Sequence, residues 1–200
     1  MILNLFFPKK CLQCGVVGVY ICDSCLKKVS PGRLVQNHYS IFKYEGVIRK
    51  AILALKYKYA TDIVHELSKI CATKLKRQKI IKSKSITLVP IPLHKKREKQ
   101  RGFNQVGLIG KEISKQMNWK YMPDLLVRSK PTTPQASLKG SARQTNLTGA
   151  FKFNPKHTKN TTHNILLFDD VYTTGSTLKE ALKVLREEGY KNIKTLAIAR

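Results

Sequence analysis

The feature that most constrains this chain is the stretch of residues 165–177, Ile-Leu-Leu-Phe-Asp-Asp-Val-Tyr-Thr-Thr-Gly-Ser-Thr. Its first four residues are too few and too continuously apolar for an amphipathic helix, so they predict a strand buried on both faces, as in a parallel sheet. Asp169 and Asp170 follow at the carboxyl end of that strand. Ligands bind at this edge in open α/β sheets. The stretch therefore predicts an α/β fold with a polar site beside a buried strand.

A helix is predicted directly after the aspartates, because apolar residues recur at helical spacing at Leu178, Ala181, Leu182 and Leu185. The N–H groups of its first turn lack partners, and the positive end of its dipole favours an anion. Hydroxyl residues and one glycine stand there: Thr173, Thr174, Gly175, Ser176 and Thr177. Gly175 lets the backbone approach an anion without a Cβ in the way. This turn is predicted to bind a phosphate.

The two carboxylates suit a different task, because like charges repel and carboxylates are poor phosphate ligands. Asp169 and Asp170 are better placed to accept hydrogen bonds from sugar hydroxyls, or to hold Mg²⁺ directly or through water. The alternative is that the whole string is an ordinary capped turn between a strand and a helix.

Four of the five cysteines form two C-x₂-C pairs near the N-terminus: Cys11, Cys14, Cys22 and Cys25. Tetrahedral Zn²⁺ takes four thiolates, and such a complete site leaves no open coordination position, so a structural zinc knuckle is predicted. Two disulfides are the alternative, which a reducing compartment disfavours. The fifth cysteine, Cys71, falls in a helical apolar stripe and is expected in the core, the alternative being a reactive thiol.

The charge balance of the chain is unusual, with 38 Lys and Arg against 12 Asp and Glu and a formal net charge of +26 at pH 7. An excess this large favours polyanionic partners, nucleic acid among them, because each neutralised phosphate releases counterions. The alternative is a solvated basic surface. No apolar run is long enough for a transmembrane segment, and the first residues do not read as a signal peptide, so a cytoplasmic location is expected.

The middle of the chain predicts further elements of the sheet. Residues 41–44 predict a short strand, and apolar spacing predicts helices from about residue 48 and over residues 61–76. Residues 56–59, Lys-Tyr-Lys-Tyr, either contact single-stranded nucleic acid or form an ordinary helix end. Residues 193–199 predict a last strand after Gly189, completing a β-α-β unit with the buried strand.

Residues 86–89 predict a second buried strand that two prolines follow. Pro90 and Pro92 are expected to fix a rigid turn and to prevent strand pairing there. A basic loop over residues 94–101 comes next, and then a helix that opens near residue 105. A rigid turn, cations and a helix N-terminus together predict a cradle for a second phosphate group.

These blocks together resemble one family. Residues 165–177 resemble the signature by which type I phosphoribosyltransferases bind phosphoribosyl pyrophosphate (PRPP). With the cysteine knuckle, the ordered blocks resemble the ComF family of competence phosphoribosyltransferase-like proteins: residues 55–57, 89–93, 101–105, Gln135 with 143–146, and 169–175. The resemblance implies a type I phosphoribosyltransferase fold over residues 36–200, a mostly parallel sheet flanked by helices, beside a zinc knuckle over residues 1–35.

The resemblance also implies roles for residues. Asp169 and Asp170 would hold the ribose hydroxyls of Mg²⁺-bound PRPP, and the hydroxyl turn would wrap its 5-phosphate. Pro92 belongs to the turn at the position of the pyrophosphate loop. Arg97 and Arg101 would stabilise the charge of the leaving diphosphate. Residues 129–150 would be a mobile loop that closes over the substrate, which their polar composition also favours.

Several functions fit these features. The first is a phosphoribosyltransferase with an unidentified acceptor. The family resemblance implies a role in natural transformation, in which incoming single-stranded DNA reaches the cytoplasm, under this function and the next. The second is a non-catalytic nucleic-acid-binding protein that keeps the PRPP fold as a ligand or regulatory site. A competence helicase and uptake-channel proteins are possible partners under both. A transcriptional regulator of the purine-repressor type is disfavoured, because no helix-turn-helix or winged segment is recognised.

Overall fold

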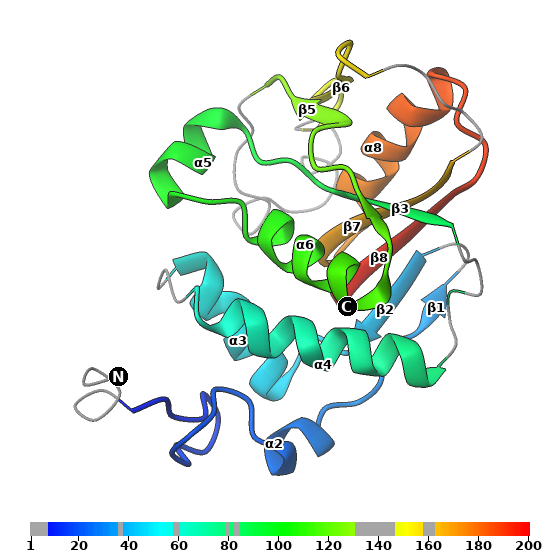
Figure 1. The fold of residues 1–200 in the computed structure, drawn as a ribbon. Coiled ribbons are helices and arrows are strands. Elements are labelled where there is room, and N and C mark those ends of the chain that lie inside the picture. The colour runs from blue at the N-terminus through cyan, green and yellow to red at the C-terminus, as the bar shows by residue number, and fades with distance from the viewer. Residues whose placement is uncertain are drawn as a thin grey trace.

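A six-stranded sheet forms the centre of the molecule (Figure 1). The computed structural model describes residues 8–35, 38–57, 61–78, 81, 85–130, 147–157 and 163–200. The strands lie in the order β1 (Leu34–Val35), β2 (His38–Phe42), β8 (Ile193–Ala199), β7 (Asn164–Val171), β3 (Ile86–Pro90) and β4 (Lys120–Tyr121). Every neighbouring pair is parallel except β1 and β2. The predicted mostly parallel α/β fold is therefore confirmed.

Helices cover both faces of the sheet (Figure 1). One face carries α3 (Gly46–Tyr57), α4 (Ile63–Gln78) and α6 (Gln105–Met117). The other carries α8 (Ser176–Glu187) and a small antiparallel pair, β5 (Leu126–Arg128) and β6 (Phe151–Phe153). Two shorter helices, α2 (Asp23–Lys27) and α5 (Lys95–Arg101), complete the described elements. Among the described residues, no helix combines the length and apolarity that crossing a membrane requires.

The continuous apolar run of β7 is explained by the two layers of helices. Leu166 and Phe168 are buried in the core under α3, α4 and α6, whereas Ile165 and Leu167 are buried in the core under α8. Because side chains alternate along a strand, a strand packed on both faces has no polar positions. This confirms the reading of the apolar run as a doubly buried strand.

Strand β7 extends past Phe168 to Val171, and Asp169 and Asp170 lie at its carboxyl end as expected. Two local expectations need correction. Strand β2 ends at Phe42, so residues 43–44 lie outside the expected strand. The basic residues 95–101 form helix α5 and not a loop, and His94 caps that helix by accepting a hydrogen bond from the Lys96 N–H.

The prolines do not prevent strand pairing as expected. Pro90 is the last residue of β3 and lies opposite Phe168, and the N–H of Ile91 donates to the Phe168 carbonyl at 2.8 Å. A strand directs alternate N–H groups to opposite neighbours, so the missing N–H of Pro90 leaves the bonds toward β7 intact. Pairing with β4 has already ended at Leu88.

Most of the expected mobile loop over residues 129–150 lies outside the described residues. Residues 131–146, which include Gln135 and the 143–146 block of the family resemblance, lie outside the described residues.

Candidate functional site

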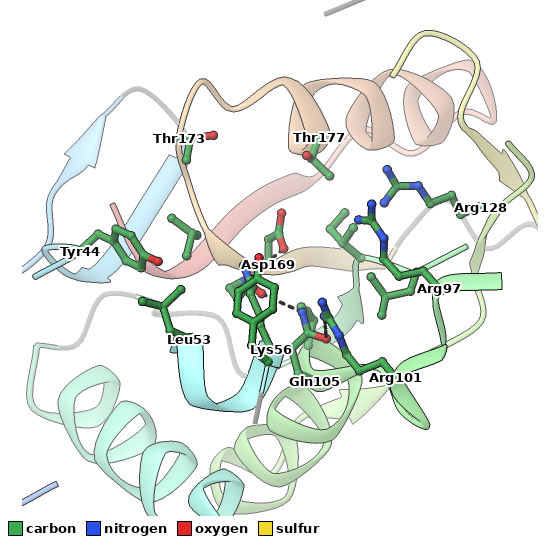
Figure 2. Close-up of a pocket in the computed structure, with 16 residues that line it drawn as sticks. Tyr44, Leu53, Lys56, Arg97, Arg101, Gln105, Arg128, Asp169, Thr173 and Thr177 are labelled. Atoms are coloured by element: carbon green, nitrogen blue, oxygen red, sulfur yellow. Dashed lines mark hydrogen bonds and ion pairs between the residues drawn. The ribbon is translucent and has the colours of Figure 1, made fainter. Parts of the chain in front are cut away.

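A polar pocket lies at the carboxyl edge of the parallel sheet, where β3 and β7 end (Figure 2). Its volume is about 330 Å³, at the lower end of the range of small-molecule sites. Residues from strand ends and from α3, α5, α6 and α8 line it: Tyr44, Leu53, Lys56, Tyr57, Ile91, Leu93, Arg97, Arg101, Gln105, Val106, Arg128, Asp169, Asp170, Val171, Thr173 and Thr177. The two aspartates and two threonines of the motif thus meet the two arginines predicted from the sequence.

Both oxygens of the Asp170 carboxylate are held by side chains of this chain. Lys56 Nζ donates to Oδ1 at 2.8 Å, and Gln105 Nε2 donates to Oδ2 at 2.9 Å (Figure 2). Arg101 Nη1 in turn donates to Gln105 Oε1 at 2.6 Å, which orients the amide. Asp170 is only 6% exposed. The carboxylate thus joins α3 and α6 directly, and α5 through Gln105, to the end of β7.

Asp169 is in a different environment. Its Oδ1 accepts the backbone N–H of Asp170 at 2.8 Å, and its carboxylate lines the pocket. Burial, and next the Asp170 carboxylate, raise the pKa of Asp169 to about 7, although Lys56 and Arg128 oppose the shift. Burial acts to lower the pKa of Lys56, but its ion pair with Asp170 outweighs that effect and raises it. An ionised Asp169 would gain from hydroxyl donors or a cation supplied by a ligand.

The hydroxyl turn begins helix α8 as predicted, with Gly175 as the N-cap residue at φ 74°. A Cβ added there would lie 2.5 Å from the Tyr172 hydroxyl oxygen, so only glycine fits beneath that ring. Thr174 Oγ1 and Ser176 Oγ lie 3.0 Å apart across the turn. Thr173 and Thr177 line the pocket, whereas Thr174, Gly175 and Ser176 shape the turn without lining it.

Three arginines stand on the pocket wall: Arg97, Arg101 and Arg128. Burial, and next the charge of Arg97, lower the pKa of Arg128 to about 10. Two guanidinium groups that repel each other in a part-buried site favour a multivalent anion. Pro92 is not among the lining residues, although its neighbours Ile91 and Leu93 are.

Sequence reasoning did not assign roles to several of these residues. Lys56 and Gln105 stand inside blocks of the family resemblance, but nothing in their local sequence shows that they meet Asp170. Arg128 and Tyr44 carried no local signal at all. Arg128 is the last residue of β5, which lies outside the six-stranded sheet, and Tyr44 follows β2 by two residues.

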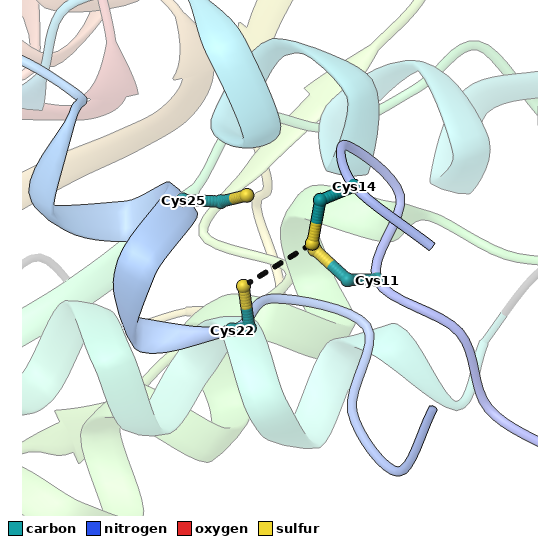
Figure 3. Close-up of side chains that lie close together, drawn as sticks. All are labelled: Cys11, Cys14, Cys22 and Cys25. Carbon is teal, nitrogen blue, oxygen red and sulfur yellow. Dashed lines mark hydrogen bonds between the residues drawn. The ribbon is translucent and has the colours of Figure 1, made fainter. Parts of the chain in front are cut away.

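The four N-terminal cysteines form a cluster (Figure 3). All four Sγ atoms lie within 4.8 Å of one another, and Cys14 Sγ and Cys22 Sγ are 3.6 Å apart. Tetrahedral zinc at its usual Zn–S length separates sulfurs by about 3.8 Å, so the cluster fits such an ion. All five cysteines are free thiols. Burial raises the pKa of Cys11, but backbone hydrogen bonds around Cys14 and Cys22 outweigh it and lower the pKa to about 6.

One carboxylate attaches this cysteine cluster to the rest of the fold. Glu66 of α4 accepts the backbone N–H groups of Tyr20 at 3.1 Å and Ile21 at 2.6 Å, directly before Cys22. Cys11 and Cys25 are buried in the same core as α3 and α4. The fifth cysteine, Cys71, is fully buried in that core as expected, and its burial raises the pKa of its thiol.

The fold and the pocket define an α/β protein with a pocket of acidic and cationic side chains at the edge of its parallel sheet and a four-cysteine cluster that could hold a metal such as zinc. The chain belongs to the ComF/ComFC family of competence proteins. It is 32% identical to Competence protein ComFC of Streptococcus pneumoniae over 165 residues, which cover 82% of this chain and 68% of that protein.

Two other relatives agree with this assignment. The chain is 34% identical to Competence protein F of Haemophilus influenzae over 113 residues, 56% of this chain and about half (49%) of that protein. It is 26% identical to DNA utilization protein YhgH of Escherichia coli strain K12 over 196 residues, 95% of this chain and 83% of that protein. No family model matches the chain. The relatives place it among competence and DNA-utilization proteins.

Proposed function

We propose that the pocket binds PRPP together with Mg²⁺ and that the protein acts on single-stranded DNA during natural transformation, in the cytoplasm. The ligand is proposed because one pocket combines three kinds of group: a hydroxyl turn at the start of α8, a carboxylate pair, and three arginines. A phosphate on the turn, a ribose beside Asp169 and a diphosphate near the arginines match PRPP group by group.

The chemistry that such a complex allows is displacement of diphosphate from C1 of the ribose. The C1–O bond breaks and the diphosphate leaves with its electron pair, so positive charge develops at C1. A nucleophilic atom of the unidentified acceptor supplies the electron pair of the new bond to C1 and gives up its proton to solvent. The Asp169 carboxylate lies beside the proposed ribose position, so its field favours that charge. Arg97, Arg101 and Arg128 would bind the departing diphosphate. Mg²⁺, held by Asp169 directly or through water, would neutralise part of its charge.

Single-stranded DNA is proposed from two features. The net charge of +26 supplies many more cations than a small substrate needs. The relatives are named as competence and DNA-utilization proteins. Zinc is proposed for the cysteine cluster, as a structural ion held by Cys11, Cys14, Cys22 and Cys25.

A thermal-shift titration tests the ligand. Mg–PRPP is expected to raise the melting temperature more than Mg–diphosphate or ribose 5-phosphate, because each of these contacts only part of the proposed site. A ligand at 100 times its Kd adds about 2.7 kcal/mol of stability. The variant Gly175→Ala should lose the shift, because its Cβ displaces the turn from beneath Tyr172. An equal shift with diphosphate alone would reduce the site to a general anion site.

The DNA part is tested separately. The logarithm of the affinity for a thymidine oligomer should fall steeply as the logarithm of the salt concentration rises. A flat dependence would exclude the lysines and arginines as phosphate contacts. Release of diphosphate from bound PRPP, measured with and without the oligomer, distinguishes an enzyme from a protein that only binds PRPP.

A further inference from the structure

We propose that helix α5 contacts the phosphates of single-stranded DNA through its lysine face, which consists of Lys95, Lys96 and Lys99. The inference rests on the proposed function, which names single-stranded DNA as a partner but assigns no surface of the chain to it. The strand would then lie directly outside the pocket wall, beside the helix that carries two of the pocket arginines.

Helix α5 has two sides in different environments. Arg97 and Arg101, four residues apart, share one side of the helix, and both line the pocket and are partly buried. At 3.6 residues per turn, Lys95 and Lys99 stand on the opposite side, and Lys96 lies on the flank between them and the arginines. All three lysines are exposed, and Figure 1 shows α5 at the periphery of the molecule. The pocket therefore uses one side of α5 and leaves the lysine face to solvent.

The charges of α5 are arranged unfavourably for an isolated helix. Five of its seven residues are cations, and Glu98 is its one anion. Lys95, Lys96 and Arg97 stand in the first turn, where the helix dipole favours anions. Lys95 and Lys99 also form a like-charge pair at i, i+4 spacing, which destabilises a helix. Phosphate groups bound to the lysine face would offset both effects, because they bring negative charge to the side of the helix that lacks it.

The lysine face has no acidic partner within the described part of the chain. None of its three lysines forms an ion pair with a described residue, and none of the side chains of α5 is buried, so packing does not explain this charge pattern. A DNA strand carries one negative charge per nucleotide, so it can neutralise several adjacent cations at once and releases counterions as it binds. Closely spaced, unpaired lysines beside a pocket for a sugar phosphate therefore fit such a strand.

The experiment measures how affinity depends on salt for a thymidine oligomer of about twelve nucleotides, for an abasic strand of equal length and charge, and for vesicles that contain phosphatidylserine. The α5 triple variant keeps both arginines of the helix and carries Lys95→Gln, Lys96→Gln and Lys99→Gln. The control triple variant lowers the net charge equally by removing three exposed lysines at the opposite, amino edge of the sheet: Lys120→Gln, Lys191→Gln and Lys194→Gln.

The α5 triple variant should reduce the magnitude of the slope of log affinity against log salt by about 2, because each phosphate contact to a single strand contributes about 0.7. At about 0.1 M salt this corresponds to roughly a hundredfold loss of affinity. The abasic strand should respond like the oligomer, the control variant should change the slope by less than about 0.7, and Mg–PRPP should still bind. Lys99→Gln alone should reduce the slope by about 0.7, which keeps the test decisive if the triple variant does not fold.

Equal losses in the two triple variants would show that net charge and not α5 attracts the strand, and would overturn the inference. An unchanged slope in the α5 variant would also overturn it, as would a loss confined to the vesicles, which would assign the lysine face to an acidic membrane surface. If the wild type binds the oligomer in these cases, the proposed function stands without the α5 contact. If the wild type binds no oligomer, the DNA part of the proposed function fails together with the inference.

Discussion

The cysteine cluster and the pocket are both polar sites, but different forces hold them in place. The pocket is built on buried strands, and its central carboxylate is bound directly by α3 and α6, and by α5 through Gln105, before any ligand arrives. The segment with the cysteine cluster buries Cys11 and Cys25 in the core of α3 and α4, but Val16 is 49% and Val17 60% exposed, and its clearest polar contact to the main fold is Glu66. The fold thus organises the pocket, whereas the cluster region is only partly packed, and we expect its stability to depend more on the four thiols.

Metal removal should therefore have the largest effect on stability, and only in the region of the cysteine cluster. Structural zinc contributes about 10–16 kcal/mol to the folding of small zinc modules. Chelation, or Cys14→Ser, should expose residues 9–27 to proteolysis and fast hydrogen exchange while β7 and β8 stay protected. Cys71→Ala is the matched control for loss of a thiol. Loss of protection across the whole sheet would show that the two regions fold as one unit.

The variant Lys56→Met should destabilise the region of the pocket. It leaves Asp170, with a side chain only 8% exposed, without its cation. Breaking a buried ion pair by removing one partner costs about 3–5 kcal/mol, measured here by urea unfolding. Lys50→Met, an exposed lysine on the same helix, should change stability little. The double variant Lys56→Met with Asp170→Asn should recover much of the loss; no recovery would mean that the pair is not coupled.

The pocket should also make the stability of the protein depend on pH. Because the pKa of Asp169 is raised to about 7, the folded protein holds this proton more tightly than the unfolded chain does. The resulting stability is full below the ordinary aspartate pKa and is lost as pH rises through about 7. Asp169→Asn should therefore be more stable than wild type at pH 8, on the order of 4 kcal/mol, and nearly equal to it at pH 4.

Urea unfolding at the two pH values measures this difference, with the exposed Glu187→Gln as control. A variant that is less stable than wild type at pH 8 would show that Asp169 is already satisfied by the protein and needs nothing from a ligand.

The smallest effect is expected from Glu66→Gln. The carboxylate accepts two backbone N–H groups beside the cysteine cluster, and hydrogen bonds to charged groups contribute about 1.5–3 kcal/mol. Hydrogen exchange at Tyr20 and Ile21 should speed up, while the pocket keeps its stability. Faster hydrogen exchange at Asp170 would instead show that α4 couples the pocket to the cysteine cluster.

The sequence predicted the local parts of both sites and missed what only tertiary packing decides. The apolar run before Asp169 and the hydroxyl turn before α8 are encoded by adjacent residues, so strand, turn and helix were all predictable. Lys56 and Asp170 are 114 positions apart, and no local pattern pairs them. Helix α5 was missed because its residues, Lys-Lys-Arg-Glu-Lys-Gln-Arg, have no apolar periodicity, and none of its side chains is buried.

Calorimetric titration of the wild type and of Asp169→Asn with Mg–PRPP, alone and with a thymidine oligomer present, measures PRPP binding and its coupling to DNA in one experiment. We expect that the wild type binds Mg–PRPP, that the oligomer alters this binding, and that Asp169→Asn weakens it at least about tenfold. A folded wild-type protein that takes up no Mg–PRPP under either condition would contradict the account. The basic surface alone would then remain as the basis of function.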